Sequence, residues 1–156
     1  SATRGFSVED TAAISLRFAC GALGTFLLSD TAASPKSWEQ TSQENPSYPT
    51  YPDEDCYIIA GTMGSLGIPT MRLWLYEGEI RSWWKPFKVS RVEVHRCDPL
   101  QRQLEHFCAV IRGEVQPLVD ARDGLKNLRV VEAILEAARS RKAIGIPLHE
   151  QQISRE

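Results

Sequence analysis

The chain has 156 residues, of which 42% are hydrophobic, and this is enough for one ordinary globular domain. Its 18 basic and 20 acidic residues are scattered, so the sequence offers no basic patch for nucleic acid. No apolar run approaches the roughly 20 residues that span a bilayer. Because the amino terminus also lacks the pattern of a secretory signal, we expect a soluble, cytoplasmic protein.

The first predicted elements are strands. Residues 8–18 alternate between apolar and polar side chains, which predicts a half-buried strand. Gly21 and Gly24 mark a turn into a second strand over residues 23–30, and the short connection favours an antiparallel hairpin. Later strands are expected over residues 56–60, before Pro69, and over 71–76, 83–87 and 89–94. Their connections are too short for crossovers, so the pairing should be mostly antiparallel.

A proline-rich segment over residues 34–55 separates these two groups of strands, and most of it should be irregular. Long loops inside compact domains are usually functional or disordered. Lys36, Trp38 and Glu39 place a cation, an aromatic plate and an acid close together, a combination that suits ligands bearing hydroxyl groups. The alternative is a tryptophan that pins the loop to the core, with two solvated charges beside it.

The second half of the chain predicts two helices. Leu100, Leu104, Phe107 and Ile111 recur at helical spacing, and Gly113 ends that helix. The apolar positions of a longer helix follow within residues 125–138. Before it, Asp120 suits the N-cap and Asp123 the first turn, which explains both acids without a catalytic role. Residues 143–148 predict a closing strand, and the polar tail from residue 149 should fray.

Together these elements predict a single α+β domain over residues 1–156, an open and mostly antiparallel sheet with two helices on one face. The other face is then free for oligomerisation. Aromatic side chains gather in the strand region, as expected of a protein interface, although they could instead form one internal core. The predicted interface residues are Trp74, Tyr76, Trp83, Trp84 and Phe87.

The sequence contains no recognisable nucleotide or metal site. The spacing of Gly61, Gly64 and Gly67 differs from the dinucleotide-binding fingerprint, and a hairpin explains it better. His106 and Cys108 fall two apart on a predicted helix, so their side chains point about 200° apart and cannot share an ion. No set of residues forms a catalytic triad, and we predict neither catalytic nor metal-binding residues.

Several short sequence segments, in their order and spacing, resemble those of one enzyme family. They lie at residues 8–12, 21–25, 34–39 and 61–66, and along the helical run 106–141. Taken together, they resemble the C-terminal domain of the Gfo/Idh/MocA family of oxidoreductases, named for glucose-fructose oxidoreductase and inositol dehydrogenase. The resemblance covers nearly the whole chain.

The resemblance implies hydride transfer between NAD or NADP and a hydroxyl carbon of a sugar, polyol or related compound. In that family an N-terminal Rossmann domain holds the cofactor and provides a catalytic lysine. This chain lacks that domain and opens at Ser1 without a methionine, as though cut from a longer enzyme. Neither a catalytic nor a cofactor-binding residue can therefore be transferred to it.

By the same resemblance, Lys36, Trp38 and Glu39 line the substrate cleft, and the open sheet face forms a homodimer or homotetramer. The chain would then be inactive alone, and its partners would be the Rossmann domain, a second copy and a small-molecule substrate. One alternative is a stand-alone ligand-binding or interaction module without a cofactor domain. A weaker alternative is a small enzyme that uses the loop over residues 36–51 by itself.

Overall fold

The computed structural model describes residues 2–147, which divide into two compact units. The first unit combines the chain up to Thr31 with the chain from His106 onward, and the second runs from Ala32 to Glu105. The boundary between the units falls inside helix α2, Pro99–Ile111.

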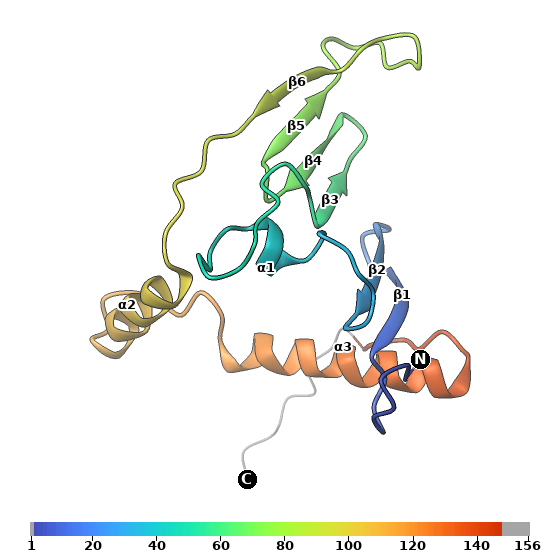
Figure 1. The fold of residues 1–156 in the computed structure, drawn as a ribbon, viewed down its shortest axis with the longest axis vertical. Helices are drawn as coiled ribbons and strands as arrows, with labels where there is room; N and C mark the ends of the chain where they lie inside the picture. The colour runs from blue at the N-terminus through green and yellow to red at the C-terminus, as the bar shows by residue number, and fades with distance from the viewer. Residues whose placement is uncertain (1, 148–156) are drawn as a thin grey trace. The chain divides into compact units, whose positions relative to one another are not determined.

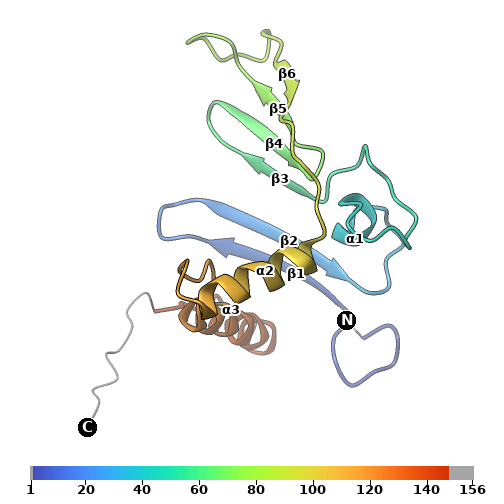
Figure 2. The same ribbon diagram turned by 90° about the vertical axis from the view of Figure 1, so that its left-hand side faces the viewer.

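The first unit contains an antiparallel hairpin. β1, Thr11–Arg17, pairs with β2, Leu23–Ser29, so that the two strands match end to end. The turn between them uses Gly21 at a φ of 88°, a left-handed conformation that glycine adopts without steric cost. Helix α3, Ala121–Ser140, belongs to the same unit, and the strands of the hairpin run across its axis (Figures 1 and 2).

Both ends of α3 are capped. Asp120 accepts hydrogen bonds from the backbone N–H of Arg122 at 2.8 Å and of Asp123 at 3.0 Å, and the Asp123 carboxylate accepts one from the backbone N–H of Asp120. This reciprocal arrangement is the predicted capping box. At the other end, Arg141 adopts a left-handed φ of 56° and turns the chain back along the helix.

The second unit contains a four-stranded meander in which every strand pairs with its neighbour in sequence (Figure 1). Leu66 lies opposite Ile59 on one side and Leu73 on the other, so these three side chains share a face of the sheet. The strands, all antiparallel, are β3, Tyr57–Ala60; β4, Gly64–Ile68; β5, Arg72–Leu75; and β6, Lys88–Arg91.

Apolar side chains remain exposed on both faces of this sheet. Ile58 and Ile59 are consecutive in β3 and therefore point to opposite faces, yet they are 71% and 60% exposed. Within residues 2–147, the buried side chains are the polar ones of Asp10, Thr41, Ser42 and Thr70, and no large apolar side chain is buried. No helix within the same range combines the length and apolarity needed to span a bilayer.

The α+β class and the antiparallel pairing are confirmed, but the strands form two sheets where the sequence predicts one. The first two strands and the last four are separated by the segment over residues 34–55, which contains helix α1, Trp38–Thr41. Alternation along a strand shows which side chains share a face. It does not show which strands pair across such a segment.

Two predicted strands are wrong. Residues 82–85 form a turn closed by a hydrogen bond from the Lys85 backbone N–H to the Ser82 carbonyl at 3.0 Å, and Pro86 cannot donate to a ladder, so residues 83–87 are not a strand. Residues 143–147 run back along α3 without strand pairing, because Arg141 directs them there. Leu148 and the predicted fraying tail lie outside the described residues.

Candidate functional site

The loop over residues 34–55 folds around the one-turn helix α1. Ser37 is its N-cap and accepts a hydrogen bond from the Gln40 backbone N–H at 3.2 Å. The Thr41 side chain is fully buried, and its hydroxyl donates to the Ser37 carbonyl at 2.7 Å. Farther along, the Tyr51 backbone N–H donates to the Gln40 carbonyl at 2.7 Å, so the returning chain is tied to the helix.

Lys36 lies at the start of this loop and forms an ion pair with Glu54 near its end. Their charged atoms are 3.1 Å apart, and the two side chains are 60% and 42% exposed. An ion pair this exposed contributes little to stability. The ammonium group is therefore held in place at the surface but remains open to a ligand.

Trp38 provides the aromatic ring of the loop. Its indole N–H donates to the Glu44 carboxylate at 2.8 Å, and its ring centroid is 6.0 Å from that of Tyr57 in β3. These two contacts fix the ring at the edge of the sheet while leaving it partly exposed. The ring thus contacts the sheet through Tyr57 and also faces solvent, and a role in ligand binding stays a prediction.

Glu39 follows in the first turn of α1, where a negative charge is favoured by the helix terminus. Its side chain is exposed. The loop thus presents Lys36, Trp38 and Glu39 on one folded segment, although each of the first two makes its nearest contact with a different acid. Those partners, Glu44 and Glu54, are not among the residues predicted from the sequence. The serine and glutamine of Ser37-x-x-Gln40 were the available signal for the helix.

The far end of the loop is attached through Asp55 to β4 and to the turn that follows it. Its carboxylate accepts a hydrogen bond from the backbone N–H of the buried Thr70 at 3.0 Å. Gly67 leaves room for this carboxylate, since a Cβ atom at that position would overlap the Asp55 side chain. Arg72 reinforces the attachment by donating to the Asp53 carbonyl at 3.3 Å.

In chemical terms the loop can bind a small polar ring. A partly exposed indole can stack on the apolar face of a sugar, and a neighbouring ammonium and carboxylate can hydrogen-bond its hydroxyl groups. The loop is held at Thr41, Tyr51 and Asp55, so these groups are presented by a fixed segment. Such preorganisation favours binding.

The predicted interface aromatics occupy two places. Trp74 lies within β5, where the Arg72 guanidinium is 5.6 Å from its ring centroid. The others belong to the connection between β5 and β6. Tyr76 and Phe87 stack there with centroids 4.3 Å apart, whereas Trp83 and Trp84 are 100% and 93% exposed.

The remaining candidate groups have structural partners. His106 accepts a hydrogen bond through Nε2 from the Leu118 backbone N–H at 3.2 Å, which braces the connection between α2 and α3. The pKa of Asp123 is lowered, first by the hydrogen bond from Lys126 and then by that from the Asp120 backbone. Within residues 2–147, no cluster of three or more His, Cys, Asp or Glu side chains is arranged to hold a metal ion.

A family model described as "Oxidoreductase family, C-terminal alpha/beta domain" matches residues 2–146. No curated protein and no solved structure matches the chain.

Proposed function

Because the chain belongs to the Gfo/Idh/MocA oxidoreductase family as its C-terminal domain, we propose that it is the substrate-side and assembly domain of an NAD(P)-dependent oxidoreductase. Its substrates are sugars, polyols or related hydroxyl compounds. The domain over residues 1–156 lines the substrate cleft and contributes to a homo-oligomer, and by itself it does not turn over substrate. The observation that carries this proposal is the family match over residues 2–146.

The substrate-lining role is supported by the loop that carries Lys36, Trp38 and Glu39. Its ammonium, indole and carboxylate groups are the types that bind sugars, and all three are exposed on a segment fixed to its sheet. The loop has no group that could carry a hydride. Hydride chemistry is consistent with a cofactor that another domain supplies.

NAD or NADP is assigned to the N-terminal Rossmann domain typical of this family. The described residues of this chain do not fit a dinucleotide. Gly64 and Gly67 lie within β4 of a hairpin and not at the start of a helix, where the phosphate-binding glycines of a dinucleotide fold are needed. No step of the reaction is therefore assigned to residues of this chain.

The assembly role is supported by apolar surface on both faces of the four-stranded sheet. So large an exposed apolar area requires an occupant, and a second copy of the chain is the one proposed here. Trp74, Tyr76 and Phe87, with the two exposed tryptophans, supply the aromatic composition found in interfaces. We assign this surface to a dimer or tetramer.

Substrate lining is tested by kinetics on the full-length enzyme, with the Rossmann domain present. Lys36→Ala should raise the KM for the preferred sugar or polyol roughly tenfold, equivalent to about 1.4 kcal/mol of lost binding, while the KM for NAD(P) stays unchanged. Since its ion pair with Glu54 is exposed, the same substitution should hardly change the melting temperature. Trp38→Phe should retain stacking and cost less than Trp38→Ala.

Lys142→Ala is the matched control, because Lys142 lies beyond the end of α3 and outside the loop. An unchanged substrate KM in both Lys36→Ala and Trp38→Ala would show that the loop does not line the substrate cleft. Cofactor binding is tested separately by calorimetry on the 156-residue chain and on the full-length enzyme. Tight NAD(P) binding by the 156-residue chain would contradict the assignment of the cofactor to the Rossmann domain.

A further inference from the structure

The connection between β5 and β6 holds two tryptophans outward on a braced turn, which we name the Trp tip, Ser82–Lys85. The stacked rings of Tyr76 and Phe87 close the base of the connection, and the Tyr76 hydroxyl donates to the Ser82 carbonyl at 3.3 Å. Arg81 anchors the same stretch to the neighbouring hairpin by donating to the Thr62 carbonyl at 2.9 Å. The conformation of the tip is therefore held by specific side-chain contacts.

The hydrogen bonds that close the turn do not require indole side chains. It is closed by the Lys85 backbone N–H and by the Ser82 hydroxyl, which accepts from the Trp84 backbone N–H at 3.2 Å. Central turn positions favour small or polar residues, yet here they hold Trp83 and Trp84, which are 100% and 93% exposed. A tryptophan can bury about 150–250 Å², so the tip displays a large apolar area suited to an apolar occupant.

The charges around the tip define that occupant further. Arg81 and Lys85 flank the tryptophans, and neither forms an ion pair within the described part of the chain. A surface that accommodates the tip should therefore combine an apolar floor with acidic side chains.

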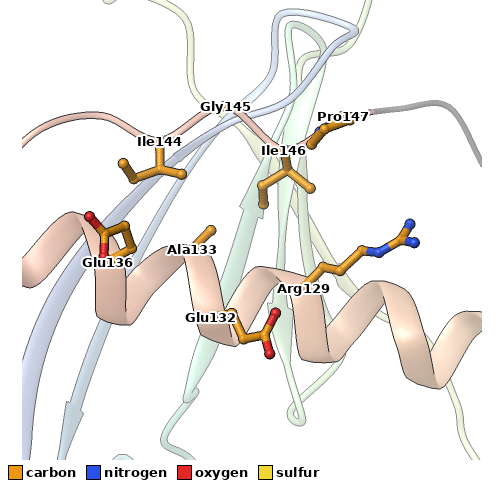
Figure 3. Close-up of a pocket in the computed structure, with 8 residues that line it drawn as sticks. All are labelled: Arg129, Glu132, Ala133, Glu136, Ile144, Gly145, Ile146 and Pro147. Carbon is orange, nitrogen blue, oxygen red and sulfur yellow. The ribbon is translucent and has the colours of Figure 1, made fainter.

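A groove with that character lies on the first unit of the same chain. It has a volume of about 340 Å³ and is bounded by α3, from Arg129 to Glu136, and by the returning residues 144–147; we name it the α3 groove. Figure 3 shows Ile144 and Ile146 pointing toward the helix, with Ala133 facing them. These residues give the groove its apolar floor.

The rim of the α3 groove is acidic. Glu132 and Glu136 lie four residues apart on α3, a spacing at which like charges repel each other and destabilise the helix. Arg129 is the one basic residue that lines the groove, so acids outnumber bases there. A cation brought by a partner would relieve the repulsion.

From this complementarity we infer that the Trp tip of one copy docks in the α3 groove of a second copy of this chain. Trp83 and Trp84 together cover the apolar floor, and Lys85 pairs with Glu136. The contact joins two different surfaces, so repeated contacts close into a ring or extend into a filament according to the rotation between copies. The inference rests on the proposed assembly role and specifies its contacts.

The test is sedimentation velocity on the full chain over a range of concentrations. Trp83→Ser and Trp84→Ser should each raise the dissociation constant of self-association at least tenfold. Lys85→Glu alone and Glu136→Lys alone should also weaken association. An equimolar mixture of the last two variants should recover it, because the altered tip of one then meets the altered groove of the other.

Leu118→Ser and Lys142→Glu are matched controls outside both surfaces, and circular dichroism checks that every variant folds. Unchanged association in the Trp83→Ser and Trp84→Ser variants would overturn the role of the tip. Weakening by these variants without an effect of Glu136→Lys, or without recovery in the mixture, would overturn the groove assignment. Association that does not depend on concentration would mean that the contact is not between copies.

Hydride transfer by the full-length variants reports on the proposed function separately. Lost association with retained turnover supports the docking contact while leaving the enzymatic role intact. If the unaltered full-length protein shows no turnover with any sugar or polyol, the enzymatic proposal fails, while the mixing experiment still decides the docking contact.

Discussion

Because Gly67 has no side chain, the loop over residues 34–55 can attach to the four-stranded sheet. The Asp55 carboxylate occupies the space next to the Gly67 Cα atom and accepts the hydrogen bond from Thr70. Any larger residue at position 67 must displace that carboxylate. The backbone of β4 and the end of the loop are thus coupled at one residue.

We expect Gly67→Ala to lower the free energy of unfolding by about 1–3 kcal/mol, the range typical of overpacking. The measurement is urea denaturation followed by tryptophan fluorescence. Gly124→Ala is the matched control, since a Cβ atom there meets only open space within α3. That control should stabilise the protein by about 1 kcal/mol. A neutral Gly67→Ala would mean that the Asp55 side chain moves aside without cost.

Asp123 makes stability depend on pH in the acid range. Its pKa is lowered by the hydrogen bonds from Lys126 and from the Asp120 backbone, so the ionised form is favoured in the folded state. The resulting stabilisation is present above the unfolded pKa, for which 3.8 is the reference, and is lost as the pH falls through the lower folded value.

Asp123→Asn should therefore destabilise the protein at pH 6, and its difference from the wild type should shrink as the pH falls below about 4. Urea midpoints measured from pH 2.5 to pH 7 check this, with the pH range chosen around the reference value for aspartate. A difference that stays constant down to pH 2.5 would assign the effect to packing instead of charge.

At the scale of elements, the two long helices, α2 and α3, were the most predictable parts of the chain. Their caps and stop signals are local, and the structure begins α3 directly after Asp120 as the sequence predicts. Non-local features were not predictable. The division into two sheets depends on pairing across the loop, and the turn at Trp83 and Trp84 places large residues where small ones are favoured.

The candidate site was predictable only in part. Lys36, Trp38 and Glu39 could be identified because a cation, an aromatic ring and an acid stand close together in sequence. Their partners could not be identified, since Glu54 is brought to Lys36 by the fold of the whole loop. Helix α1 was missed because a single turn carries too few residues to show helical periodicity.

The capping box of α3 gives a prediction for this element. Asp120→Ala should lower the free energy of unfolding by about 1 kcal/mol, because two backbone N–H groups lose their acceptor. Asp120→Ser should recover most of this loss, since serine also accepts at an N-cap. Thermal denaturation followed by circular dichroism at 222 nm, the usual helix band, makes the comparison. Equal losses in the two variants would exclude capping as the cause.

At the scale of the whole molecule, residues 2–147 fold without a fully buried large apolar side chain. Apolar surface on both faces of the second unit's sheet must therefore be covered by other parts of the protein or by a partner. A partner that binds only the folded state stabilises it by mass action.

We accordingly expect the melting temperature of the full chain to rise with its concentration, by about 2–4 °C for a hundredfold increase if it dimerises. Calorimetry at two concentrations suffices. The Trp83→Ser variant should show a smaller rise than the wild type. A melting temperature independent of concentration would argue against assembly through the surfaces proposed here.

The first unit is discontinuous in sequence, because its hairpin precedes the second unit and α3 follows it. During synthesis on the ribosome, the four strands of the second unit can pair as soon as β6 has left the ribosome, since each strand pairs with its sequence neighbour. The hairpin of β1 and β2 can also pair early, but α3 of the same unit is synthesised only after the second unit. The order of synthesis therefore completes the loop-bearing unit before the unit that contains the α3 groove.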